Sequence, residues 1–196
     1  MSENMAWLDI ETTGLEPERD EILEVGIVIT TPDLEIVAEI SQVVGYPSFV
    51  IRDALGDNEF VKEMHTKSGL LAEVEKEEQW LSDVEQLMVE FSRSQVPYKK
   101  VPLAGSTISF DRSFLRLHMP ELNDYFHYRS IDVSSIRELA KLWFPELPEP
   151  PKSEAHRSLE DIHASIKLLK YYKENIFDPA ALYKMRVDPG TSNTIL

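Results

Sequence analysis

Apolar residues recur along the chain in patterns that predict five β-strands. A short apolar run over residues 5–10 comes first, and a β-branched run over 21–30 predicts a second, largely buried strand. Alternation over 34–44 indicates a third strand, and short turns between these three predict an antiparallel meander. Shorter runs over 101–105 and 127–133 predict the last two strands.

Helical periodicity dominates the remainder of the chain. Helices are predicted over residues 66–96, from Asp111 onward, over 134–144 and over about 156–175. In this prediction Ser134 is an N-cap residue. Glycines and prolines break any pattern over 45–65, so we expect irregular structure there. Four prolines predict a loop over 145–153.

This order of elements predicts an α/β domain. Its sheet would be a single mixed five-stranded sheet with helices on both faces. We expect residues 1–177 to form that domain, because a chain of 196 residues suits one domain with a sizeable core. Residues 178–196 are weakly patterned, and we expect them to form a C-terminal extension or a disordered tail.

The first strand carries two carboxylates. Side chains at i and i+2 of a strand point to the same face, so Asp9 and Glu11 project together, while Leu8 and Ile10 project from the opposite face. Two adjacent carboxylates repel each other and resist desolvation, which makes a divalent metal a natural counter-charge. A solvated edge strand explains the pair equally well, because 35 of the 196 residues are acidic.

Charge and composition narrow the classes of function. The formal net charge is −15, whereas a protein that holds a long nucleic-acid duplex needs a basic face for its phosphates. A nucleic-acid substrate should therefore be short, or held through few contacts. The chain has no cysteine, which excludes disulfides and agrees with a reducing cytoplasm, where we expect the protein. We expect no signal peptide in the first residues and no membrane span.

Three further residues join the two carboxylates as candidates. Asp111 opens a helix after an apolar strand, where a carboxylate taken alone is better explained as a cap favoured by the helix dipole. Asp161 lies beside the buried stripe of the last helix rather than opposite it. His156 comes five residues earlier, so a loop before the helix could place it above Asp161. A histidine there could accept a proton from a water held by a metal.

The whole set is far more specific than any of its members. The chain resembles the DEDDh branch of the 3′-to-5′ exonucleases, whose motifs match Asp9 with Glu11, Asp111, and His156 with Asp161. Within that superfamily it is similar to the oligoribonuclease family, over about residues 5–176. The segments that carry this similarity are residues 7–15 (WLDIETTGL), 64–70 (MHTKSGL) and 125–134 (YFHYRSIDVS).

The resemblance implies a ribonuclease-H-like fold with a two-metal site. Asp9, Glu11, Asp111 and Asp161 would hold two divalent cations, Mg²⁺ or Mn²⁺, directly or through water. One cation would lower the pKa of a water to give hydroxide, and the other would stabilise the departing 3′ oxygen. His156 would be the general base for that water.

The resemblance also implies residues that contact a short RNA. Leu15 matches an apolar wedge between two bases, and Phe60 stands in the place of an aromatic residue that stacks on a base. His65 matches a histidine near the substrate, and Thr107 replaces a serine that helps cap the 5′ phosphate. The residues that the second subunit of a homodimer contributes to the neighbouring site are matched by Tyr128, Arg129 and Ser134.

We therefore expect a 3′-to-5′ exoribonuclease that degrades short oligoribonucleotides, including dinucleotides, to mononucleotides. Its partners would be short RNA and a second copy of itself, with no membrane and no long duplex. Ile10 and Thr12 stand where oligoribonucleases often have leucine and methionine, so a DEDDh exonuclease of proofreading or repair type, acting on single-stranded DNA, stays open. A catalytically silent dimeric module that binds short nucleotides is disfavoured, because all five catalytic positions are intact.

Overall fold

The computed structural model describes residues 4–150 and 156–177, and the structural statements below concern these residues. The strands are β1 (Met5–Thr12), β2 (Ile22–Thr30), β3 (Ile36–Val43), β4 (Pro102–Gly105) and β5 (His127–Asp132). They form one sheet in the order β3-β2-β1-β4-β5. The first three pair antiparallel, whereas β4 joins β1, and β5 joins β4, in parallel. The predicted mixed five-stranded sheet and its meander are confirmed.

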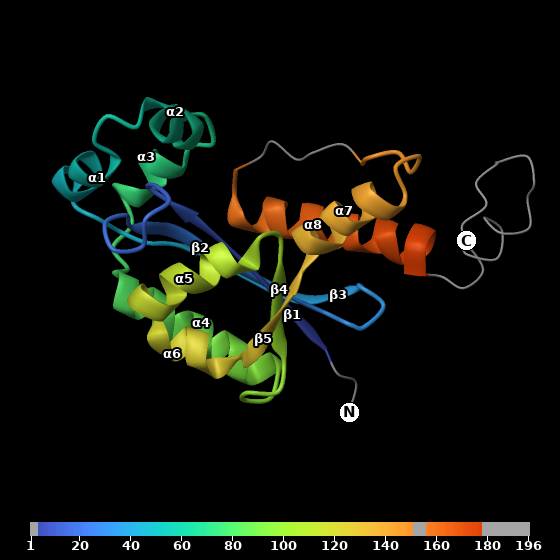
Figure 1. Cartoon of the computed structure of the whole chain (residues 1–196). Helices are drawn as coiled ribbons and strands as arrows, with labels where there is room; N and C mark the ends of the chain where they lie inside the picture. The colour runs from blue at the N-terminus through green and yellow to red at the C-terminus, as the bar shows by residue number, and fades with distance from the viewer. Residues whose placement is uncertain (1–3, 151–155, 178–196) are drawn as a thin grey trace, which may run out of the picture.

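Helices cover both faces of this sheet. They are α1 (Ser48–Leu55), α2 (Glu59–Lys67), α3 (Leu70–Val74), α4 (Leu81–Gln95), α5 (Ile108–His118), α6 (Pro120–Tyr125), α7 (Val133–Trp143), α8 (Ser158–Tyr172) and the π-helical turn η1 (Lys173–Phe177). Figure 1 shows α4, α5 and α6 on one face and α7 and α8 on the other, while α1–α3 gather at the end toward which β1 runs. The prediction of helices on both faces is confirmed.

Alternate residues of β1 enter different hydrophobic clusters. Leu8 and Ile10 pack toward α4 and α5, whereas Trp7 packs toward α8. Because strand side chains alternate, Asp9 and Glu11 share the face of Trp7, as the sequence pattern predicts. β2 is buried along its whole length between the two helical layers. A third cluster joins α1–α3 to the ends of β2 and β3.

The prediction of irregular structure over residues 45–65 is wrong. This segment contains α1 and most of α2, and two of the residues that break the pattern lie at the boundaries of α1. Pro47 is the N-cap residue of α1, and Gly56 is its C-cap residue with a φ of 48°. Trp80 lies within the helix predicted over residues 66–96, but it precedes α4 as its N-cap residue and is 60% exposed.

Two helix starts differ from the prediction. The N-cap residue of α7 is Asp132, not Ser134, because the Asp132 carboxylate accepts a hydrogen bond from the Ser134 backbone N–H at 2.9 Å. α5 begins at Ile108, so Asp111 lies inside its first turn and is not the cap. Within the described ranges, each helix is either too short or too polar to cross a bilayer. The predicted extension over residues 178–196 lies outside those ranges.

Candidate metal centre and active site

The candidate site lies at the carboxyl end of β1, where this strand separates from β4. Their parallel ladder ends at the pair Trp7–Ala104. Farther along β1, the backbone N–H of Ile10 donates a hydrogen bond to Oδ1 of Asp111 at 3.0 Å, so the first turn of α5 takes the place of a strand neighbour. Ligand sites of open α/β sheets commonly occupy the crevice outside the carboxyl ends of diverging strands.

Three carboxylates meet on the α8 side of this strand end. Asp9, Glu11 and Asp161 each offer one oxygen, and these oxygens lie within 4.8 Å of one another. Asp161 comes from the first turn of α8. That helix approaches the sheet closely because Gly26, which faces Asp9 across the β1–β2 ladder, has no side chain. A Cβ atom on Gly26 would lie 2.7 Å from Oγ of Ser158.

Burial and mutual repulsion make these carboxylates costly to ionise. Burial raises the pKa of Asp9 well above its usual range, and the charges of Asp111, Glu11 and Asp161 raise it further. Burial, followed by the charge of Asp161, raises the pKa of Glu11 to about 8. Burial also raises the pKa of Asp111 to about 7, although its backbone hydrogen bonds oppose the shift. A bound dication would offset this repulsion, and hard carboxylate oxygens suit Mg²⁺ or Mn²⁺.

Asp111 lies beside the other three carboxylates. It is 3% exposed, one of its oxygens binds the β1 backbone, and its charge raises the pKa of Asp9. The structure therefore brings all four predicted acidic residues into one neighbourhood, with three of them close enough to share an ion. The donor set fits a divalent metal centre.

Two histidines flank the carboxylates. His65 of α2 is fully buried, with Nε2 2.9 Å from the carbonyl oxygen of Thr12 and Nδ1 3.9 Å from Oε2 of Glu11. The first contact requires the N–H on Nε2, which leaves the lone pair of Nδ1 turned toward Glu11. Burial lowers the pKa of His65, and the nearby His156 lowers it further. His156 is half-buried and directly precedes the N-cap residue of α8, with a left-handed φ of 51°.

The residues predicted to contact bases are exposed near this end of the sheet. Leu15, in the turn after β1, is 74% exposed, and Phe60, in the first turn of α2, is 75% exposed. The hydrogen bond between His65 and Thr12 joins α2 to the end of β1. Both apolar side chains therefore belong to elements that border the carboxylates.

Thr107 and Ser134 form a hydroxyl pair at the carboxyl ends of β4 and β5. Their side-chain oxygens lie 3.1 Å apart within one chain. The carboxylate of Asp132 accepts hydrogen bonds from both of their backbone N–H groups, each at 2.9 Å. Thr107 holds a left-handed φ of 57° at the start of α5. The half-buried carboxylate of Asp132 thus orients both hydroxyl residues.

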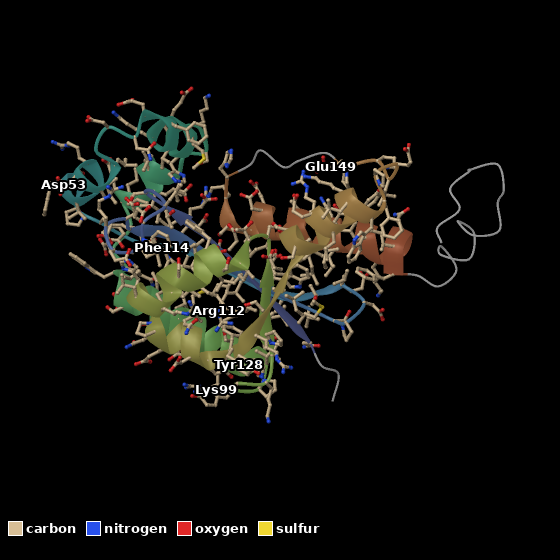
Figure 2. All side chains as sticks on the ribbon, in the orientation of Figure 1. Asp53, Lys99, Arg112, Phe114, Tyr128 and Glu149 are labelled. Carbon is tan, nitrogen blue, oxygen red and sulfur yellow. The ribbon has the colours of Figure 1, made fainter. Side chains whose placement is uncertain are left out.

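Tyr128 and Arg129 lie at the other end of β5. Tyr128 lies four positions before Asp132, which is about 13 Å along a strand. Tyr128 is 74% exposed, and the Arg129 guanidinium carbon lies 5.5 Å from its ring centroid. In the view of Figure 2, Tyr128 lies far from Asp53 of α1. The structure does not bring Tyr128 and Arg129 to the carboxylates of their own chain.

Three residues around the site were not predicted from the sequence. A glycine inside a β-branched run is a signal for close backbone approach, and Gly26 carries it. Glu24 and Arg157 form a salt bridge between positions 133 residues apart. No local pattern in the sequence signals that pairing.

Solved structures of exonuclease I share this fold. The zinc-bound complex of E. coli exonuclease I with single-stranded DNA gives a TM-score of 0.64 over 91% of this chain and 42% of that chain, at 15% identity. The complex of the same enzyme with a dT13 oligonucleotide also gives a TM-score of 0.64, over 89% of this chain and 42% of that chain, at 15% identity. The chain thus spans about two fifths of these proteins. The likeness assigns the ribonuclease-H-like fold.

Sequence relatives identify the family. The exonuclease family RNase_T matches residues 6–169. Oligoribonuclease of Bordetella pertussis is 43% identical over 173 residues, which cover 88% of this chain and 94% of that protein. Mitochondrial oligoribonuclease of the mouse is 41% identical over 179 residues, which cover 90% of this chain and 75% of that protein. The chain is therefore an exonuclease, a hydrolase of phosphodiester bonds. Within that class it belongs to the oligoribonuclease family.

Proposed function

We propose that the protein removes mononucleotides from the 3′ end of short oligoribonucleotides, dinucleotides included. The observation that carries the proposal is the cluster of Asp9, Glu11 and Asp161 within 4.8 Å, in a chain whose relatives are named oligoribonuclease. The net charge of −15 supports a short substrate, because few phosphates then need to be neutralised. We also propose a cytoplasmic location, in keeping with a chain that has no cysteine.

The four acidic residues would hold two divalent cations, Mg²⁺ or Mn²⁺. Asp9, Glu11 and Asp161 would bind directly, and Asp111 directly or through water. Bound cations supply Lewis acidity at the attacking water and at the departing 3′ oxygen. The raised pKa values of Asp9 and Glu11 support this role, because each carboxyl needs a cation nearby to stay ionised at neutral pH.

His156 would accept the proton of the attacking water. Its place directly ahead of α8 supports this role, because the first turn of that helix carries Asp161. An imidazole changes its protonation state near neutral pH and can pass the proton on to solvent. His65 is fully buried against Glu11 and Thr12. It would hold the metal ligand Glu11 and the end of β1 in place instead of contacting bases.

Exposed apolar side chains would hold the bases and hydroxyl groups would hold the 5′ phosphate. Leu15 would separate the two bases of a dinucleotide, and Phe60 would stack on one of them, a contact that tolerates any base. Thr107 and Ser134 would donate to the 5′ phosphate. Their hydrogen bond within one chain favours a role for Ser134 in its own subunit. The family resemblance instead places Ser134 in the neighbouring site.

Tyr128 and Arg129 would act in the site of a second subunit. Their positions, about 13 Å (Tyr128) and about 10 Å (Arg129) along β5 from Asp132, support a partner site. β5 is an edge strand with exposed side chains, and the guanidinium fork of Arg129 suits a terminal phosphate. Coexpressing Asp161→Ala and Tyr128→Ala chains tests the shared site, since a mixed dimer then has one intact site. Failure of such dimers to recover activity would count against sharing.

The reaction itself is tested with a 5′-labelled pentaribonucleotide and Mn²⁺ or Mg²⁺. We expect a ladder of shorter labelled products that ends in the labelled mononucleotide. Asp161→Asn should remove this activity, whereas Glu160→Gln, which changes the exposed acid next to it in the same turn, should leave it intact. Immediate release of the labelled mononucleotide would mean the opposite polarity and would contradict the proposal.

A further inference from the structure

Arg157, the residue after His156, commits its guanidinium group to two salt bridges. Its Nε and Nη2 atoms donate to the carboxylate of Glu24 at 3.2 and 3.0 Å. Its Nη1 and Nη2 atoms donate to the carboxylate of Glu73 at 3.0 and 2.8 Å. Both edges of the guanidinium plane are therefore occupied by carboxylates. Arg157 is not available to bind a substrate phosphate.

Glu24 holds the start of α8 in a second way. This residue of β2 is 2% exposed, and its Oε2 accepts a hydrogen bond from the backbone N–H of Ser158 at 3.0 Å. The N-cap residue of α8, Arg157, makes no side-chain capping bond of its own. Glu24, a residue of β2, therefore caps α8. It accepts hydrogen bonds from both the side chain of Arg157 and the backbone N–H of Ser158. These are the two residues that directly follow His156.

The backbone of His156 needs such support. Its φ of 51° is left-handed, a conformation that residues other than glycine and asparagine adopt at a cost in energy. Conformations of this kind persist where surrounding contacts over-determine them, often at functional sites. The contacts of Arg157 and Ser158 with Glu24 hold the backbone directly after His156.

Glu73 connects Arg157 to the helices on the substrate side of the site. It lies on α3, which follows the helix that carries Phe60 and His65. The salt bridge between Arg157 and Glu73 therefore ties α8 to α3, which directly follows the helix whose Phe60 is proposed to stack on a base. We infer that Arg157 is a positioning residue, clamped by Glu24 and Glu73, that holds His156 in place for proton transfer and links it to α1–α3. This inference rests on the proposed role of His156.

The test compares Arg157→Gln with Arg157→Lys and a matched control. Arg137→Gln breaks the salt bridge between Arg137 of α7 and Glu149. The side chains of Arg137 and Arg157 have similar exposure, 22% and 25%. The measurements are Tm, the rise in Tm on adding Mn²⁺, and kcat and KM for a labelled diribonucleotide. Arg157→Gln should lower kcat about 10- to 100-fold, the range for residues that orient a catalytic group. Arg157→Lys should recover part of kcat.

The other measurements separate positioning from folding and from metal binding. KM and the Mn²⁺-dependent rise in Tm should stay close to wild type in Arg157→Gln, because the carboxylates of the metal centre are unchanged. Arg137→Gln should keep wild-type kcat. If Arg157→Gln does not fold, Glu73→Gln carries the test, since Glu73 is half exposed and its loss leaves the buried pair with Glu24 intact. It should lower kcat less than Arg157→Gln does.

A double variant shows whether Arg157 acts through His156. In the His156→Asn background, adding Arg157→Gln should lower the residual kcat by no more than about twofold, because its target is already gone. A full further loss in that background would overturn the inference, as would wild-type kcat in Arg157→Gln or in Glu73→Gln. Wild-type protein that hydrolyses no short RNA would instead overturn the proposed function.

Discussion

Glu11 makes the stability of the metal-free protein depend on pH. The residue is 8% exposed, and burial followed by the charge of Asp161 raises its pKa from 4.5 to about 8. A carboxyl group with a raised folded-state pKa binds its proton more tightly when folded. Its contribution to stability is therefore complete below pH 4.5 and is lost as the pH rises through 8. At about 1.4 kcal/mol per pH unit, the whole loss is about 5 kcal/mol.

His65 sets the lower limit of the pH range in which the effect of Glu11 on stability can be measured separately. Burial lowers its pKa below 6.5, so protonation costs more in the folded state and stability falls as the pH drops through 6.5. Above pH 6.5 the stability contribution of His65 no longer changes with pH, so the buried carboxyl groups of the site determine how stability changes with pH. From pH 6.5 to 8 the loss from Glu11 is about 2 kcal/mol, or about 4–8 °C in Tm for a domain of this size. Asp111, with a pKa raised to about 7, adds to it.

Thermal unfolding in EDTA at about pH 6.5 and about pH 8 measures this effect. The Tm of the wild-type protein should fall between the two values, and Glu11→Gln should fall less, because its amide stays neutral throughout. Glu18→Gln, which changes an exposed acid after β1, should follow wild type. Excess Mn²⁺ should restore the wild-type Tm at the higher pH. Equal losses in wild type and Glu11→Gln would refute the assignment of the slope to this buried carboxyl.

Three other substitutions test separate parts of the site. Gly26→Ala places a Cβ 2.7 Å from Oγ of Ser158, so it should lower the free energy of unfolding in urea by about 1–3 kcal/mol. It should also reduce the Mn²⁺-dependent rise in Tm, because α8 carries Asp161. An unchanged rise would contradict the close approach of α8 as a requirement for metal binding. Phe60→Ala should raise KM for a diribonucleotide about fivefold or more while Phe60→Trp keeps it, and equal KM values would remove the stacking role. Arg129→Ala should weaken substrates with a 5′ phosphate by about 10-fold or more and barely affect dephosphorylated ones; equal losses would exclude its phosphate role.

The sequence predicted those parts of the site that depend on local periodicity. Alternation along β1 is a property of any strand, so the shared face of Asp9 and Glu11 follows from their spacing alone. The same holds for Asp161, whose place beside Ile162 puts it near the sheet once α8 is recognised. Asp111 required more, because a carboxylate in a first helical turn is also explained by the helix dipole. Its contact with the N–H of Ile10 exists only because β1 and β4 diverge.

The parts that were missed depend on tertiary contacts. Prolines and glycines over residues 45–65 predict irregular structure, yet Pro47 and Gly56 mark the ends of α1. Glu24 and Arg157 are 133 residues apart, so no local pattern could pair them. Ser134 was assigned as a cap from its residue type, whereas Asp132 occupies that position and leaves the Ser134 hydroxyl to bind Thr107.

The most direct test of the account is a competition between two substrates. Purified protein with Mn²⁺ would receive a labelled diribonucleotide together with a single-stranded DNA of about thirty nucleotides, and kcat/KM would be measured for each. The account predicts that the dinucleotide is converted to mononucleotides with the higher kcat/KM, and that Asp161→Asn or EDTA abolishes the reaction. Preference for the long DNA, or binding of the dinucleotide without hydrolysis, would contradict it.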